Sequence, residues 1–125
     1  MKHLLDVNVL LAAIWDSHVH HARTKAWLED KTVTVCPISA LGFIRISTHK
    51  RGYGFTMDAA REGLQKFAAD MKAVRIPDDL DALDSHPRTS DQVTDHYLAD
   101  LAAKHGLKLA TLDEQLKHPS ADLLL

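Results

Sequence analysis

The chain has little of several features that mark specialised classes of protein. Its 125 residues include one cysteine, so it forms no internal disulfide, and we expect a reducing compartment. Basic and acidic side chains nearly balance, at 15 and 17, which gives a formal net charge of −2. No overall basic field therefore attracts nucleic acid, and any such contact has to come from a local patch.

Long hydrophobic runs are missing as well. The apolar stretch MKHLLDVNVLLAAIW is interrupted by Asp6 and Asn8 and is too short to span a bilayer. We therefore expect a cytoplasmic protein with no secretory signal and no membrane partner. A chain of this length favours a single domain over residues 1–125, in which roughly two-thirds of the unfolded surface is buried.

Strand-like and helix-like segments alternate along the sequence. β-branched and apolar runs predict strands at 3–5, 32–36, 73–76 and 108–110, with a last edge strand at 122–125. Apolar residues at helical spacing predict helices at 7–15, 20–30, 39–49, 57–71 (after a Thr56 cap), 78–83 and 93–105. This alternation predicts an α/β fold in which helices cover both faces of a parallel sheet.

Three aspartates fall where such sheets form their sites, at the carboxyl ends of the strands. Asp6 follows the first strand, Asp113 follows the strand at 108–110, and Asp95 lies near the start of a helix that should face the same edge. Neighbouring carboxylates repel and raise one another's pKa, and a divalent ion such as Mg²⁺ or Mn²⁺ removes that penalty. Taken singly, each aspartate is better explained as a helix cap or a turn residue. Taken together, their spacing makes a metal site and these local roles equally good explanations.

Three motifs then add a family resemblance. LLDVNVLLA near the start, GFIRI in the middle and VTDHYLADLAAKHGLKLATLD towards the end occur in this order, and the chain resembles the PIN-domain nucleases. It looks most like the VapC-type toxins of bacterial toxin–antitoxin pairs. The resemblance covers essentially the whole chain. It implies a three-layer α/β/α sandwich with a central parallel sheet of four or five strands, Mg²⁺- or Mn²⁺-dependent cleavage of RNA, a cognate antitoxin and a homodimer.

The resemblance also assigns residues. Asp6, Asp95 and Asp113 match three of the family's acids and are expected to be catalytic and to bind the metal. Asn8 and Thr111 match the polar residues that support the site, although helix-start and turn chemistry explains both nearly as well. Arg45, within GFIRI, is expected to contact RNA or the antitoxin.

One expected acid is missing. The family usually has a glutamate shortly before the Gly-Phe pair, and Ala40 stands at that position. The alanine is either natural or an engineered Glu→Ala change; we favour the engineered interpretation, because an active toxin would kill its expression host. With Ala40 we expect weak metal binding and poor cleavage. Asp91, Asp100 and Glu114 are not expected to replace the missing acid, and Asp100 in particular is expected to be solvated.

Two other functions fit part of the sequence. If Ala40 is natural, the chain is a catalytically dead PIN module that acts in antitoxin binding and promoter regulation. A phosphatase-like enzyme is suggested by Asp6-Val7-Asn8, which loosely resembles an Asp-x-Asp nucleophile motif. However, Asn8 cannot transfer a proton as the second aspartate of that motif does, so this alternative is much weaker.

Overall fold

A five-stranded parallel sheet forms the centre of the computed structural model, which describes residues 2–124. The order across the sheet is β3-β2-β1-β4-β5, and every neighbouring pair is parallel. The strands are β1 (Lys2–Leu5), β2 (Thr32–Val35), β3 (Val74–Arg75), β4 (Lys108–Thr111) and β5 (Ala121–Leu123). The first strand, β1, lies in the middle of the sheet, and the later strands are added on both sides of it.

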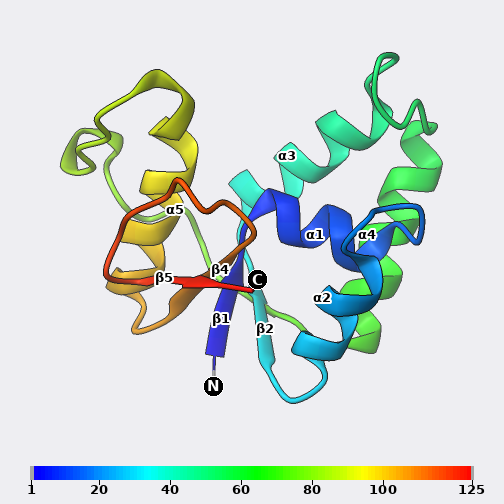
Figure 1. Ribbon diagram of the computed structural model, residues 1–125, viewed down its shortest axis with the longest axis horizontal. Helices are drawn as coiled ribbons and strands as arrows, with labels where there is room; N and C mark the ends of the chain where they lie inside the picture. Colours follow the sequence, from blue (N-terminus) through cyan, green and yellow to red (C-terminus); the bar gives the residue numbers. More distant parts are fainter. Residues whose placement is uncertain (1, 125) are drawn as a thin grey trace.

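Helices cover both faces of this sheet, as Figure 1 shows. One face carries α1 (Val7–Ile14), α2 (His21–Leu28), α3 (Pro37–Thr48) and α4 (Met57–Asp70), and the other carries α5 (Val93–Lys104). Two short 3₁₀ turns, Ala82–Asp84 and Ser90–Gln92, precede α5. No helix within residues 2–124 combines the length and the apolar character needed to cross a membrane. The three-layer α/β/α arrangement expected from the resemblance is confirmed.

Alternation along the strands divides the core into two parts. Leu5 and Ala110 point to the layer of α1 to α4, whereas Leu4 and Leu109 point to α5, and all four side chains are fully buried. Since side chains alternate between the faces of a strand, two adjacent apolar residues are what a strand covered on both faces requires. The central strands β1 and β4 are therefore fixed from both sides.

The ends of two helices follow the expected chemistry. Thr56 caps α4, because its hydroxyl accepts a hydrogen bond from the Ala59 N–H at 3.0 Å. Gly106 follows α5 with a φ of +71°, a left-handed conformation that glycine adopts without strain.

Two details of the sequence prediction need adjustment. The helix predicted at 78–83 is wrong: Asp81 accepts a hydrogen bond from the Leu83 N–H at 2.9 Å and caps only the 3₁₀ turn Ala82–Asp84. The edge strand predicted at 122–125 is present as β5, Ala121–Leu123, and Leu125 lies outside the described residues.

The contact between α1 and α3 depends on a glycine of the GFIRI motif. A Cβ atom built on Gly42 would lie 2.6 Å from the Val7 Cγ2 atom, closer than carbon atoms approach. The next residue, Phe43, is fully buried and stacks on Trp15, with 5.5 Å between the ring centroids. The Gly-Phe pair therefore sets how closely α3 packs against α1.

Candidate active site

Asp6 lies at the carboxyl end of β1, where the strand turns into α1. Its backbone N–H donates to the Ala110 carbonyl of β4 at 3.0 Å, which holds it against the neighbouring strand. Its side-chain Oδ1 accepts a hydrogen bond from the Val7 N–H at 2.8 Å at the start of α1. Only 1% of Asp6 is exposed, so the carboxylate is held in a fixed position inside the fold.

Thr111 connects two of the three predicted acids. Its hydroxyl donates to Asp6 Oδ2 at 2.8 Å and accepts a hydrogen bond from the Asp113 N–H at 3.1 Å. Because β4 lies beside β1, the last residue of β4 comes directly next to Asp6. Asn8 adds a second link, since its Oδ1 accepts a hydrogen bond from the Leu112 N–H at 3.2 Å.

Asp95 supplies the third carboxyl from the first turn of α5. Its carboxyl lies near enough to the Asp6 and the Asp113 carboxyls to interact with both. Partial burial, followed by repulsion from Asp6 and Asp113, raises the pKa of Asp95 to about 7. The structure therefore brings together the three aspartates that were predicted from separate parts of the chain.

Burial also raises the pKa of Asp6, although the Thr111 hydroxyl and the Val7 N–H partly offset this by stabilising the charged form. Three carboxyl groups that lie near one another and are partly removed from water repel one another unless a proton or a cation reduces the charge. Their donor atoms are all hard oxygens, the class that Mg²⁺ and Mn²⁺ bind. The chemistry of these three side chains therefore suits a divalent cation.

Ala40 and Arg45 both lie on α3, a helix that carries none of the three carboxylates. Ala40 lines a cavity of about 340 Å³ between α3 and α4, together with Ile44, Arg61 and Arg75, and this cavity contains none of the three carboxylates. The Arg45 side chain is exposed in the last turn of α3. The expectations for both positions stay predictions.

The possible replacement acids behave differently from one another. Asp91 and Glu114 are exposed, and the expectation that neither replaces the missing acid stays a prediction. Asp100, however, was expected to be solvated, and that prediction was wrong. Its Oδ1 lies 2.7 Å from His118 Nε2, and its Oδ2 accepts a hydrogen bond from the Ser85 hydroxyl at 2.8 Å.

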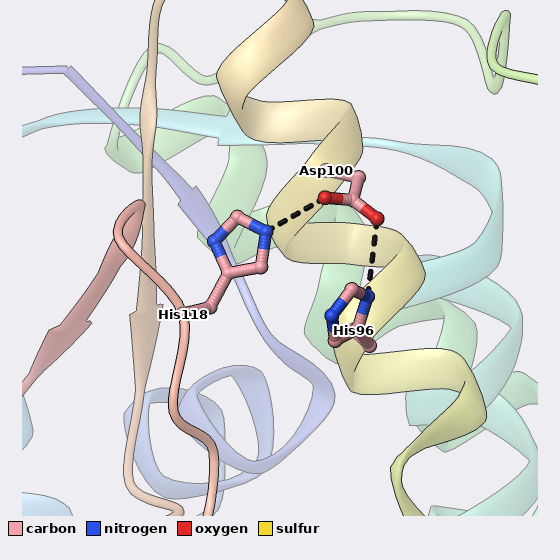
Figure 2. A group of neighbouring side chains, drawn as sticks. All are labelled: His96, Asp100 and His118. Carbon is pink, nitrogen blue, oxygen red and sulfur yellow. Dashed lines mark hydrogen bonds and ion pairs between the residues drawn. The ribbon is translucent and has the colours of Figure 1, made fainter. Parts of the chain in front are cut away.

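Asp100 belongs to a second group of polar side chains that sequence reasoning missed. His96, Asp100 and His118 each place a possible metal-ligand atom within 4.8 Å of the others (Figure 2). His96 and Asp100 are four residues apart on α5, a spacing that places both on one face and that the sequence does show. No pattern in the sequence indicated His118, because only the fold brings its segment beside α5.

The chain is similar to proteins of a known family. The PIN domain family matches residues 3–121 of the chain. The chain is 35% identical to Ribonuclease VapC38 of Mycobacterium tuberculosis over 123 residues, which cover 88% of this chain and 84% of that protein. It is 34% identical to Ribonuclease VapC39 of the same species over 131 residues, with 93% and 91% covered.

A solved structure supports the fold. The crystal structure of VapBC2 from Rickettsia felis, bound to a DNA fragment from its promoter, includes a chain that matches with a TM-score of 0.66. The sequences are 15% identical, and the match covers 98% of this chain and 97% of the other. The family match and the relatives extend over most of the sequence, and this chain therefore belongs to the PIN-domain family.

Proposed function

We propose that this chain is the toxin of a toxin–antitoxin pair and a Mg²⁺- or Mn²⁺-dependent endoribonuclease, with the metal held by Asp6, Asp95 and Asp113. One observation carries the proposal: three carboxyl groups from β1, α5 and the end of β4 converge at one edge of the sheet. The names of the VapC relatives give the reaction class. When bound, the ion would supply Lewis-acid stabilisation of the phosphodiester and a water of lowered pKa.

The protein's own groups prepare this site. The Val7 N–H and the Thr111 hydroxyl each hold one oxygen of Asp6, and the Gln115 N–H holds Asp113 Oδ1 at 2.9 Å. Such fixed orientation lowers the cost of assembling ligands around a cation. Asp95, whose pKa is raised to about 7, has to release any proton it holds when a cation binds, so metal affinity should rise with pH.

The partners of the proposed toxin follow from the same family. We infer an RNA substrate, a cognate antitoxin that blocks the carboxylate site, a cytoplasmic location and a homodimer. Arg45, exposed at the end of α3, is proposed to contact RNA or the antitoxin. Ala40 leaves the site without its fourth acid, so we propose that cleavage by this sequence is slow, whether the alanine is natural or engineered.

The alternative role rests on Ala40 alone. If the site is too weak to bind a metal, the chain acts as a catalytically dead PIN module that binds the antitoxin and regulates the promoter complex. This alternative keeps the fold and the partner but removes the RNA chemistry. The phosphatase interpretation gains nothing, because Asn8 is engaged with the backbone of Leu112.

The experiment is an RNA cleavage assay of the full chain with Mg²⁺, with Mn²⁺ and with a chelator. We expect slow, metal-dependent cleavage that falls at least about 100-fold in Asp6→Asn and in Asp113→Asn, because direct ligands matter more than the groups that orient them. Asp91→Asn is the matched control, since Asp91 is exposed near the start of α5. Cleavage that persists in the chelator, or equally in Asp6→Asn, would exclude the proposed site.

A further inference from the structure

The second polar group lies on α5 and on the segment between β4 and β5. In Figure 2, His96 and Asp100 project from successive turns of α5 toward His118, which comes from the facing segment. All three side chains are only partly exposed, at 21% for His96, 25% for Asp100 and 10% for His118. This group shares no residue with the three-carboxylate site.

Its dimensions are close to those of a metal site. Asp100 Oδ1 lies 2.7 Å from His118 Nε2, and Asp100 Oδ2 lies 3.1 Å from His96 Nδ1. A tetrahedral zinc site, with bonds near 2.0–2.1 Å, separates its ligand atoms by roughly 3.3 Å. The His96 distance is close to this separation, and the His118 distance is shorter and has to lengthen when an ion binds. One ligand atom from each of the three residues lies within 4.8 Å of the others.

We propose that His96, Asp100 and His118 form a second divalent-metal site, one that takes a transition-metal ion, with Zn²⁺ preferred over Mg²⁺. Imidazole nitrogen is a good ligand for Zn²⁺ and a poor one for Mg²⁺, which requires oxygen. A water would complete the tetrahedron. Ser85, which is buried and donates to Asp100 Oδ2 at 2.8 Å, orients the carboxylate as hydrogen-bonded groups do around bound metals.

The charges at the group favour a cation. Burial alone would raise the pKa of Asp100, but hydrogen bonds from His118 and Ser85 outweigh burial and lower the pKa, so the carboxylate is ionised. The ionised carboxylate beside the two imidazoles supplies a negative charge for an ion to neutralise. The three-residue group thus contains one anionic ligand, as zinc sites with two histidines and one carboxylate do.

Metal binding requires a defined change at His118. In the structure the Ser120 N–H donates to His118 Nδ1 at 3.0 Å, so Nε2 carries the ring proton and donates it to Asp100. If Nε2 binds an ion, the ring proton has to move to Nδ1. The Nδ1–H group and the Ser120 N–H, both donors, then face each other. Zinc binding therefore breaks the Ser120 bond, which gives the site a signature that binding elsewhere would not have.

The position of the site gives it a structural effect. α5 carries Asp95, and the segment after β4 carries Asp113, so an ion between His96, Asp100 and His118 would clamp together two elements of the carboxylate site. The inference does not depend on RNA cleavage. It holds equally if the chain is catalytically dead.

The test measures Zn²⁺ binding to the full chain by calorimetry, with excess Mg²⁺ present to occupy the carboxylate site. We expect one Zn²⁺ per chain and at least about a tenfold loss of affinity in both His96→Ala and His118→Ala. His105→Ala is the matched control, because His105 also pairs with an aspartate, Asp79 at 2.7 Å, outside this three-residue group. Asp6→Asn should retain the binding, which separates this site from the catalytic proposal.

A measurement on the unaltered chain covers the case in which a histidine variant does not fold. Zn²⁺, but not Mg²⁺, should shift the ring-nitrogen resonances of His96 and His118 and the amide resonance of Ser120 in NMR spectra. Unchanged resonances at these three residues, or equal Zn²⁺ affinity in the unaltered chain and both folded variants, would show that the group is a metal-free hydrogen-bond network.

Discussion

The Thr111 hydroxyl lies 2.8 Å from Asp6 Oδ2, although 105 residues separate them in the chain. The contact exists because β4 pairs with β1 and both strands end at the same edge of the sheet. Thr111 also accepts the Asp113 N–H, so a single buried hydroxyl sets the positions of two of the three carboxylates. Its role therefore goes beyond that of a turn residue.

Replacement of Thr111 tests this relationship. Thr111→Val keeps the shape of the side chain but removes the hydroxyl, and we expect a 10- to 100-fold loss of Mn²⁺ affinity, as is typical when a group that orients a ligand is lost. Thr111→Ser, which keeps the hydroxyl, is the control and should stay within a few-fold of the unaltered chain. Calorimetric titration with Mn²⁺ measures both; equal affinities for the valine and serine variants would contradict the role of the hydroxyl.

The raised pKa of Asp95 predicts how the stability of the metal-free protein depends on pH. The pKa of Asp95 is about 7 in the folded state and 3.8 in the unfolded chain. The stabilisation of the fold by protonated Asp95 is therefore complete below pH 3.8 and is lost as the pH rises to 7. The loss is on the order of 1 kcal/mol, because solvent screens this half-exposed carboxyl. Denaturant unfolding in a chelator, from acid to neutral pH, measures it.

Asp95→Asn isolates this contribution, because asparagine resembles the protonated acid and does not titrate. We expect its stability between pH 4 and 7 to fall less than that of the unaltered chain, by roughly the same 1 kcal/mol. Asp91→Asn is the control, and its slope of stability against pH should match that of the unaltered chain. A slope that is identical in all three proteins would mean that the three carboxyls do not interact as their positions indicate.

Restoration at position 40 tests the missing acid. Ala40→Glu is expected to raise Mg²⁺-dependent RNA cleavage at least about tenfold, because a fourth carboxylate strengthens the hold on the ion. The cavity around Ala40 offers a competing partner, since Arg61 and Arg75 line it as well. Ala40→Gln, of equal size but without charge, is the control. If both variants cleave RNA at the same rate, the introduced carboxylate does not help to bind the metal.

The approach of the three aspartates to one edge of the sheet could be predicted from the sequence, for a physical reason. Asp6 and Asp113 each follow an apolar strand, and parallel strands end at a common edge, so local pattern and topology together place them. Asp95 followed from the direction of α5. The double hydrogen bond of Thr111 could not be predicted in detail, because it depends on the register of β4 against β1.

The group at Asp100 shows where such reasoning stops. Its spacing from Asp95 correctly placed it on another face of α5, but a face turned away from one site is not necessarily in solvent. The loops before α5 and after β4 cover that face with Ser85 and His118. Loop paths of this kind depend on tertiary packing, and neither residue pattern nor helix periodicity encodes them.

The last prediction concerns the Gly-Phe pair. Gly42→Ala should destabilise the fold by about 1–2 kcal/mol, because the added methyl would overlap the Val7 side chain, and this overpacking exceeds the helix propensity gained. Val7→Ala opens the space, so the two changes should not be additive: in the double variant, Gly42→Ala should cost less than it does alone. Urea unfolding of the four proteins in this cycle measures the coupling. An additive result would mean that α1 and α3 move apart freely, and Gly42 would then have no packing role.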